Sequence, residues 1–231
     1  MKLSLKKLKR KPKPHKTRDG KIGITLTAHN IDTIIDIGAN IGQTRDLLRE
    51  NGFNGDIISV EPLPSLQDML QEKAKTDPKW QVLEPLALGD HNGECEINIS
   101  ESSDMSSLLP ASKELITALP RTNVTGKATI PMKTLNTLYQ ELNLENKRVF
   151  IKMDTQGYEM KILECAKETL DKIIGIQVEM SLFPLYEGEV LFDEVIALLK
   201  QNGFTPHMLI ETNFSRKLKR QLQIDGIFFK D

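Results

Sequence analysis

Short apolar runs alternate with amphipathic stretches along most of the 231-residue chain. The run Thr33–Ile37 places apolar side chains on both faces of an extended segment, which is typical of a buried parallel strand. The stretches at 42–51 and 189–202 have the helical period, and each is followed by a glycine, Gly52 or Gly203, that favours helix termination. Strands that alternate with helices in this way predict an α/β fold built on a mainly parallel sheet.

The same alternation continues to the end of the chain. Further strands are expected at 56–60, 81–86, 148–153, 173–180, 205–210 and 224–229, and further helices at 65–75, 134–142 and 157–170. The stretches 94–99 and 127–133 alternate like exposed antiparallel strands, so we expect a small β-hairpin insertion after the third strand, with a serine-rich loop at 100–107. No helix closes the chain, which suits a last strand inserted antiparallel.

The composition is that of an ordinary globular protein. Hydrophobic residues make up 39% and charged residues 27%, and no apolar run reaches the roughly 18 residues of a membrane-spanning helix. The N-terminus lacks the apolar core of a signal peptide. The two cysteines, Cys95 and Cys165, stand far apart without metal or redox spacing, so we expect a cytoplasmic protein in a reducing setting.

The net charge of −1 conceals an uneven distribution. Residues 1–21 contain ten Lys or Arg and one acid, and residues 22–231 carry a net charge of −10. We therefore expect a flexible basic tail at 1–21 and one domain at 22–231. A solvated tail is the simplest interpretation, and docking on an anionic membrane surface, with peripheral localisation, is the next. The acidic domain and the aromatic content of 5% speak against nucleic acid as a partner.

A glycine-containing turn follows the first expected strand. Asp36 is followed by Gly38 and Gly42, and a polar, helix-forming segment begins directly afterwards. Glycine lets the backbone approach a ligand closely, and the free N–H groups at a helix start favour electron-rich ligand atoms. Ligands of open α/β sheets bind at the carboxyl ends of the strands. The turn is therefore a candidate ligand site, although a plain tight turn has the same pattern.

The residues around this turn discriminate among ligands. Glu61 ends the second expected strand, where an acid accepts hydrogen bonds from ribose hydroxyls. The third glycine of a dinucleotide site is missing, and Gln43-Thr44 is not the Lys-Ser/Thr pair of a P-loop. Asp36 would repel a pyrophosphate. S-adenosylmethionine, which has a ribose, an amino group, a sulfonium and no phosphate, fits this pattern.

Several further motifs lie at the ends of expected strands. They are Pro85-Leu86-Ala87-Leu88-Gly89-Asp90, Lys152 to Glu159 (K-M-D-T-Q-G-Y-E), and Gln177-Val178-Glu179 followed by Leu185-Tyr186-Glu187-Gly188. Together with D-I-G-A-N-I-G-Q-T and the Glu61-Pro62 pair, they make the sequence resemble the FkbM family of S-adenosylmethionine-dependent methyltransferases from about Thr33 to Phe229. One position departs from the family pattern, because Gln156 stands where the family more often has Glu.

The resemblance implies a class I methyltransferase fold, which is Rossmann-like, with helices on both faces of a seven-stranded sheet in the order 3-2-1-4-5-7-6. It implies methyl transfer to an oxygen, often a hydroxyl of a sugar or natural product, so the expected partner is a small-molecule or carbohydrate acceptor. By the same resemblance, the expected cofactor-binding residues are Asp36, Gly38, Asn40, Gly42 and Thr44 around the methionine and ribose parts, Glu61 at the ribose hydroxyls, and Ala87 and Leu88 near the adenine.

Two acids are candidate catalytic residues. Methyl transfer to a hydroxyl needs a base, and Asp154 or Glu179 could accept the proton or hold a divalent cation that acidifies the hydroxyl. The sequence requires no metal and identifies no metal ligands. Asp154 could instead cap the helix that follows it. Two other functions stay open: a non-catalytic S-adenosylmethionine-binding module that docks on a membrane, and an NAD-dependent oxidoreductase, against which the missing glycine and Asp36 argue.

Overall fold

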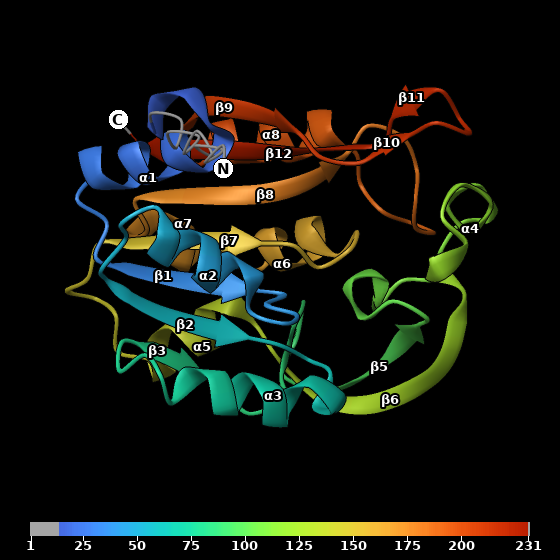
Figure 1. Ribbon diagram of the computed structural model, residues 1–231, viewed down its shortest axis with the longest axis horizontal. Coiled ribbons are helices and arrows are strands. Elements are labelled where there is room, and N and C mark those ends of the chain that lie inside the picture. The colour runs from blue at the N-terminus through green and yellow to red at the C-terminus, as the bar shows by residue number, and fades with distance from the viewer. Residues whose placement is uncertain (1–13, 231) are drawn as a thin grey trace, which may run out of the picture.

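The computed structural model describes residues 14–230 (Figure 1). Residues 1–13, most of the expected basic tail, lie outside the described residues. After a short 3₁₀-helix, η1 (Pro14–Lys16), the helix α1 (Arg18–Ala28) crosses the boundary expected between residues 21 and 22. Thr17 caps this helix by accepting a hydrogen bond from the Gly20 amide (3.1 Å). The basic residues from Arg18 onward therefore belong to a packed helix.

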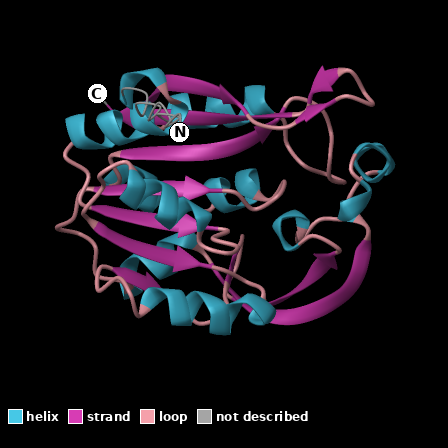
Figure 2. Ribbon diagram, in the orientation of Figure 1, coloured by secondary structure: helices cyan, strands magenta, loops and turns pink. Residues whose placement is uncertain are grey.

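Seven strands form the central sheet (Figures 1 and 2). They lie in the order β3-β2-β1-β7-β8-β12-β9, with β1 (Thr33–Ile37), β2 (Asp56–Val60), β3 (Trp80–Val82), β7 (Val149–Met153), β8 (Gly175–Ser181), β9 (Phe204–Glu211) and β12 (Gln223–Lys230). β12 pairs antiparallel with both of its neighbours, whereas the pairs among the first five strands of the order are parallel. The predicted α/β class and strand order are confirmed.

Helices cover both faces of the sheet (Figure 1). On one face lie α1, α2 (Gln43–Glu50) and α3 (Pro64–Ala74), and on the other α5 (Leu135–Glu141), α6 (Glu159–Glu164), α7 (Lys167–Lys172) and α8 (Phe192–Gln201). Neighbouring residues of β1 point to opposite faces, so Ile34 packs with α1 to α3 and Ile35 packs with the other set. The apolar run of the sequence thus supplies both cores.

The expected insertion after the third strand is present. β5 (Gly93–Ser100) and β6 (Val124–Lys133) form an antiparallel pair, and β4 (Ala87–Leu88) adds to β6 in parallel. Between the two long strands lie η2 (Ser103–Met105), α4 (Lys113–Ala118) and η3 (Pro120–Thr122). A separate small hairpin, β10 (Phe214–Ser215) with β11 (Arg220–Gln221), stands before the last strand.

Two expected elements differ in the structure. The third strand ends at Val82, well before 86, and the single helix expected at 157–170 is wrong because α6 and α7 are separate. Asn136 of α5 reaches the break between them, where its amide donates to the Cys165 carbonyl (3.0 Å) and its oxygen accepts from the Thr169 amide (3.0 Å). A side chain from another helix thus satisfies backbone groups that a continuous helix would pair internally.

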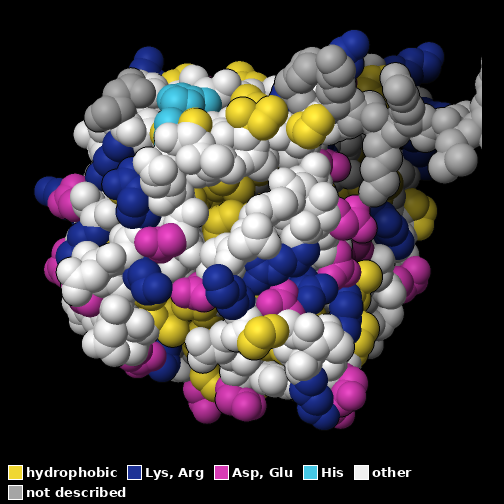
Figure 3. All heavy atoms as spheres, turned by 60° about the vertical axis from the view of Figure 1, so that its left-hand side comes forward, with side chains coloured by type: hydrophobic (Ala, Val, Ile, Leu, Met, Phe, Trp, Pro, Cys, Tyr) yellow, Lys and Arg dark blue, Asp and Glu magenta, His cyan; other side chains and the backbone are white. Residues whose placement is uncertain are grey.

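The surface carries charges of both signs. Figure 3 shows Lys and Arg intermingled with Asp and Glu over the lower half of one face, and a hollow with hydrophobic side chains above them. Within residues 14–230, no helix is long and apolar enough to cross a membrane.

Candidate functional site

The turn between β1 and α2 requires glycine at two positions. Gly38 has φ +77° and Gly42, the N-cap of α2, has φ +82°. A Cβ on Gly38 would collide with the Asp154 carbonyl oxygen, and one on Gly42 would press against the ring of Trp80. The turn is therefore packed between the end of β7 and the third strand, and only glycine fits both its conformation and its space.

Glu61 connects the end of β2 to this turn. Its carboxylate accepts hydrogen bonds from the backbone amides of Asn40 (2.7 Å) and Leu63 (3.0 Å). Only 4% of the residue is exposed, and this burial raises the pKa of Glu61 to about 7, against the opposing effect of the two amides. The acid that the sequence places at the ribose position is thus oriented by the glycine turn itself.

A buried cation lies beneath the turn. The Lys152 ammonium in β7 is 3.6 Å from Asp36 Oδ1 and 3.4 Å from Asp154 Oδ2. Burial alone would lower the pKa of Lys152, but the carboxylates of Asp154 and Asp36 raise it above its ordinary value. Asp36, expected to line the cofactor site, is instead fully buried and paired with this lysine. Burial raises its pKa, and Lys152 opposes that effect.

Asp154 and Glu179 are brought together by Gln156. The Gln156 amide nitrogen donates to Asp154 Oδ1 (2.7 Å) and to Glu179 Oε2 (3.0 Å), and its amide oxygen accepts from the Tyr186 hydroxyl (2.7 Å). Gln223 donates a second hydrogen bond to Glu179 Oε2 (2.7 Å). Burial, then the nearby carboxylate of Asp154, raises the pKa of Glu179 well above its usual value. An ionised glutamate at position 156, the residue that the family more often has there, could not donate these bonds.

Glu159 supports the loop between β7 and α6. Its two carboxylate oxygens accept the backbone amides of Thr155 (2.6 Å) and Gly157 (2.9 Å). The residue is 6% exposed, and burial raises its pKa to about 7. Glu159 therefore holds the loop that carries Asp154 and Gln156.

These elements enclose a first cleft at the carboxyl ends of β1, β2 and β7. It encloses about 640 Å³, including the part open to solvent. Its polar lining includes Asn40, Glu61 and Asp154, and the serine-rich loop contributes Ser103 and further residues of its own. The described residues that line it include no Lys, Arg or His. Such a cleft suits a ligand with cationic and hydroxyl groups and disfavours a pyrophosphate.

The serine-rich loop lies over this cleft. Ser103 Oγ accepts a hydrogen bond from the Asn40 side chain (3.1 Å), and Ser107 Oγ donates to the Gln156 carbonyl (2.7 Å). The loop therefore links the glycine turn to the loop after β7, and it covers the first cleft.

The structure divides the predicted residues among three places. Six of them line the first cleft: Gly38, Asn40, Glu61, Ala87, Leu88 and Asp154. Thr44 and Glu179 line a second cleft, which Asp154 also borders. Asp36 and Gly42 line neither cleft: Asp36 is paired with Lys152, and Gly42 packs against the ring of Trp80. Neither Lys152 nor the role of Gln156 was expected from the sequence. A lysine inside an otherwise apolar strand was the available signal for Lys152.

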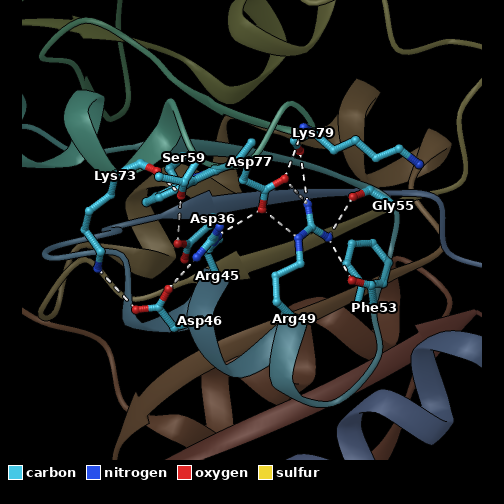
Figure 4. Close-up of polar contacts among 12 residues, drawn as sticks. Asp36, Arg45, Asp46, Arg49, Phe53, Gly55, Ser59, Lys73, Asp77 and Lys79 are labelled. Carbon is cyan, nitrogen blue, oxygen red and sulfur yellow. Dashed lines mark hydrogen bonds and ion pairs between the residues drawn. The ribbon is translucent and has the colours of Figure 1, made fainter.

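A network of ion pairs anchors α2, which follows the turn (Figure 4). Asp77, before β3, accepts hydrogen bonds from Arg45 Nε (2.9 Å) and Arg49 Nε (2.8 Å) on one face of α2. The Arg45 guanidinium also lies over the ring of Trp80, 4.9 Å from its centroid. These contacts hold the first turn of α2, and with it Gly42, against the third strand.

No metal site is formed by the part of the chain that the structure describes. No group of three or more His, Cys, Asp or Glu side chains there is placed to hold a metal ion. The acids near Asp154 are instead joined by Lys152 and Gln156. The residues of the first cleft fit S-adenosylmethionine, because Glu61 directly follows β2, the position at which acids of nucleotide-binding α/β folds accept hydrogen bonds from ribose, and the remaining charges of the lining are negative.

Comparison with known proteins agrees with this geometry. A sequence model of the methyltransferase FkbM domain matches residues 36–206, a range that starts at the glycine turn and ends in β9. The 2-O-methyltransferase NoeI of Sinorhizobium fredii (strain NBRC 101917 / NGR234) is 26% identical over 172 residues, which cover 72% of this chain and 70% of that protein.

Comparison with solved structures finds methyltransferases at low sequence identity. Magnesium protoporphyrin IX methyltransferase (ChlM) from Synechocystis PCC 6803, with bound S-adenosylmethionine, has a TM-score of 0.49 and 9% identity, over 94% of this chain and 80% of that one. Aeropyrum pernix fibrillarin, in complex with S-adenosylmethionine, has a TM-score of 0.47 and 11% identity, over 84% and 66%. The family assignment rests on the sequence match from 36 to 206, which contains the glycine turn, Glu61 and the Asp154 loop. The chain therefore belongs to the FkbM family of S-adenosylmethionine-dependent methyltransferases.

Proposed function

We propose that this methyltransferase acts on a hydroxyl oxygen of a small-molecule or carbohydrate acceptor, with Asp154 as the base. The observation that carries the proposal is the position of Asp154, which borders both clefts and has a side chain 33% exposed. The name of the relative NoeI, a 2-O-methyltransferase, supports transfer to oxygen.

Bound in the first cleft, S-adenosylmethionine would supply a sulfonium methyl group, which needs no further activation. Gly38, Asn40, Glu61, Ala87 and Leu88 are the lining residues that would hold it. The chain's main contribution is alignment of the acceptor, since well-oriented reacting groups gain up to about 7–11 kcal/mol over free ones.

The proton of the acceptor hydroxyl passes to Asp154. Lys152 and Gln156 each contact one oxygen of this carboxylate, at 3.4 Å and 2.7 Å, and so fix its orientation. Glu179 acts through Gln156 as a positioning residue, because its Oε2 already accepts two amide hydrogen bonds and its side chain is buried. General bases of this kind contribute about 10²–10⁴-fold to a rate.

The test combines binding with turnover. Calorimetry of the wild type should show saturable binding of S-adenosylmethionine, and methyl-labelled cofactor should transfer its label to a sugar in a panel of hydroxylated acceptors. Asp154→Asn should keep cofactor affinity within about threefold while transfer falls by about 100-fold or more. A wild type that binds no cofactor would refute the proposal, and cofactor binding without transfer to any acceptor would favour the non-catalytic binding module. Saturable NAD(H) binding would favour the oxidoreductase, against which the lack of a basic side chain among the described lining residues of the first cleft argues.

The N-terminal charge supports a separate proposal, docking of residues 1–21 on an anionic membrane surface. Ten basic residues and one acid occupy this segment, and each basic side chain near such a surface contributes about 1 kcal/mol. A chain that lacks residues 1–13 keeps Thr17 and the whole of α1, so it is the appropriate truncation. It should sediment less with anionic vesicles than the full chain, and equal sedimentation would exclude docking by the deleted residues.

A further inference from the structure

A second cleft opens on the sheet face that α1 and α2 cover. It encloses about 1090 Å³, including the part open to solvent. Its floor is formed by side chains of β1, β7, β8 and β12 that point to this face, and its two walls are α1 and α2.

The two clefts meet at the proposed base. Asp154 and Gln43 line both of them. An acceptor in the second cleft can therefore place its hydroxyl next to Asp154 while the first cleft holds the cofactor, and the methyl group forms its bond to the acceptor oxygen as its bond to the sulfonium sulfur breaks.

The end of the second cleft near Asp154 is polar. Asp225 of β12 pairs with Arg18 of α1 (2.9 Å) and accepts a hydrogen bond from Gln177 of β8 (3.2 Å). Thr212 Oγ1 is buried there and has no hydrogen-bond partner among residues 14–230. Both cations of this cleft, Arg18 and Lys152, are already paired with carboxylates. Groups that both donate and accept hydrogen bonds, such as uncharged hydroxyls, match this end better than an anion does.

The other end of the cleft is apolar. On the floor of the cleft, Lys152 lies nearer to Asp154 along β7, and Phe150 lies farther from it. The walls at this farther end are also apolar, with Ile22 and Leu26 on α1 and Leu47 and Leu48 on α2. The polarity therefore falls steadily with distance from Asp154.

From this gradient we propose that the second cleft is the acceptor site and that it takes an amphipathic acceptor. An uncharged, hydroxylated head group lies next to Asp154, and an apolar substituent of the same molecule lies between α1 and α2. The inference rests on the proposed function for the direction of transfer, while the binding of an apolar substituent is a separate property of the cleft.

One wall of this site and part of its floor lie outside the family match. α1 and β12, which contribute Arg18, Ile22, Leu26 and Asp225, fall outside residues 36–206. The selection of an apolar substituent is therefore shared between α1, which lies outside the matched range, and side chains of α2 and β7 within it.

The test uses methyl and octyl glycosides of the same sugar, the octyl form below its micelle concentration. In the protein with labelled isoleucine methyl groups, the octyl glycoside should shift the NMR signal of Ile22, which lines the cleft and is 5% exposed. It should leave the signal of Ile24 in place, because Ile24 is 49% exposed and is not among the lining residues of the cleft. Ile22→Val and Ile24→Val, both conservative, assign the signals.

The methyl glycoside should shift neither. Equal shifts of both signals would indicate surface adsorption of the alkyl chain and overturn the proposal, as would the absence of any shift.

A kinetic arm tests the same site with any sugar that is methylated. The octyl glycoside should have a KM at least tenfold lower than the methyl glycoside, since each buried methylene strengthens binding, and Leu47→Ser should reduce this ratio at least threefold. An unchanged ratio in Leu47→Ser would overturn the proposal. Calorimetry with S-adenosylmethionine separates this proposal from the proposed function. A wild type that does not bind the cofactor refutes the proposed function, whereas a shift of the Ile22 signal by the octyl glycoside would still show that the second cleft binds an apolar substituent.

Discussion

The two clefts that meet at Asp154 differ in charge and in origin. The first is lined by acids and amides without a basic side chain among the described residues, and it is built from the glycine turn and the ends of β2 and β7. The second contains two cations, Arg18 and Lys152, each paired with acids, and its walls are α1 and α2. The first cleft, proposed for the cofactor, is lined only by residues within the family match, whereas the second, proposed for the acceptor, takes one wall, α1, and part of its floor, β12, from outside that range.

Lys152 is the residue on which both halves depend, and its loss should have the largest effect. Lys152→Met leaves Asp36 and Asp154 without their cation, so the free energy of unfolding should fall by about 3–5 kcal/mol. Urea denaturation measures this change. Lys127→Met is the matched control, because the Lys127–Glu96 pair is exposed and should contribute less than about 1 kcal/mol. If the free energy of unfolding falls equally little in both variants, the buried charges around Lys152 do not stabilise the second cleft.

Gly38 distinguishes the first cleft from the second. In Gly38→Ala a Cβ would collide with the Asp154 carbonyl, so affinity for S-adenosylmethionine should fall by about 100-fold, which is about 2.7 kcal/mol. Gly52→Ala is the control, since Gly52 also has positive φ (+87°) but nothing within 4 Å of the added methyl group. It should show only backbone strain of about 1–2 kcal/mol in stability and unchanged cofactor affinity. Normal binding by Gly38→Ala would contradict the assignment of the turn.

Glu61 makes the first cleft sensitive to pH. Burial raises its pKa to about 7, so it is largely protonated at pH 6 and ionised at pH 8, and only the carboxylate accepts strongly from hydroxyl groups. Cofactor affinity should therefore rise about tenfold between pH 6 and pH 8. Calorimetry at both values measures it, and Glu61→Gln should bind weakly without this dependence. A pH-independent wild type would show that Glu61 does not contact the cofactor as proposed.

Asp77 should affect stability less than Lys152 does, because it acts only on the wall that both clefts share. Asp77→Ala removes the acceptor for Arg45 and Arg49 of α2, and stability should fall by about 1–2 kcal/mol. Thermal unfolding measures the change. Glu72→Ala, which breaks an exposed pair with Lys75, should stay within about 0.5 kcal/mol. Equal effects in the two variants would show that the network does not anchor α2.

The residues that the sequence assigns to the cofactor half of the site have local determinants. Gly38 and Glu61 were identified from their place at strand ends, and both line the first cleft. Asp36 was expected in the cofactor site, but it is fully buried within β1 and paired with Lys152, which lies more than a hundred positions away. The pattern of residues within one strand does not show which charged residue of a neighbouring parallel strand will pair with it.

Helix α1 was not predicted, for a related reason. Its segment contains Gly20 and Gly23 and several β-branched residues, all of which have low intrinsic helix propensity. The helix forms because Ile22 and Leu26 pack into the core that Phe150 and Phe229 also occupy. Tertiary packing overrides helix propensity here. Because α1 forms one wall of the second cleft, that wall was not predicted either.

By itself the sequence determined the α/β class, the strand order through the family resemblance, and the chemistry of the donor side, since short-range patterns of glycine, acid and apolar residues encode each of them. The tertiary structure decided which acids meet. Gln156 joins Asp154 to Glu179, Lys152 joins Asp36 to Asp154, and Arg18 reaches Asp225 from 207 positions away. Contacts of this kind depend on the distances between strands and helices after folding, and no local pattern of residues specifies those distances.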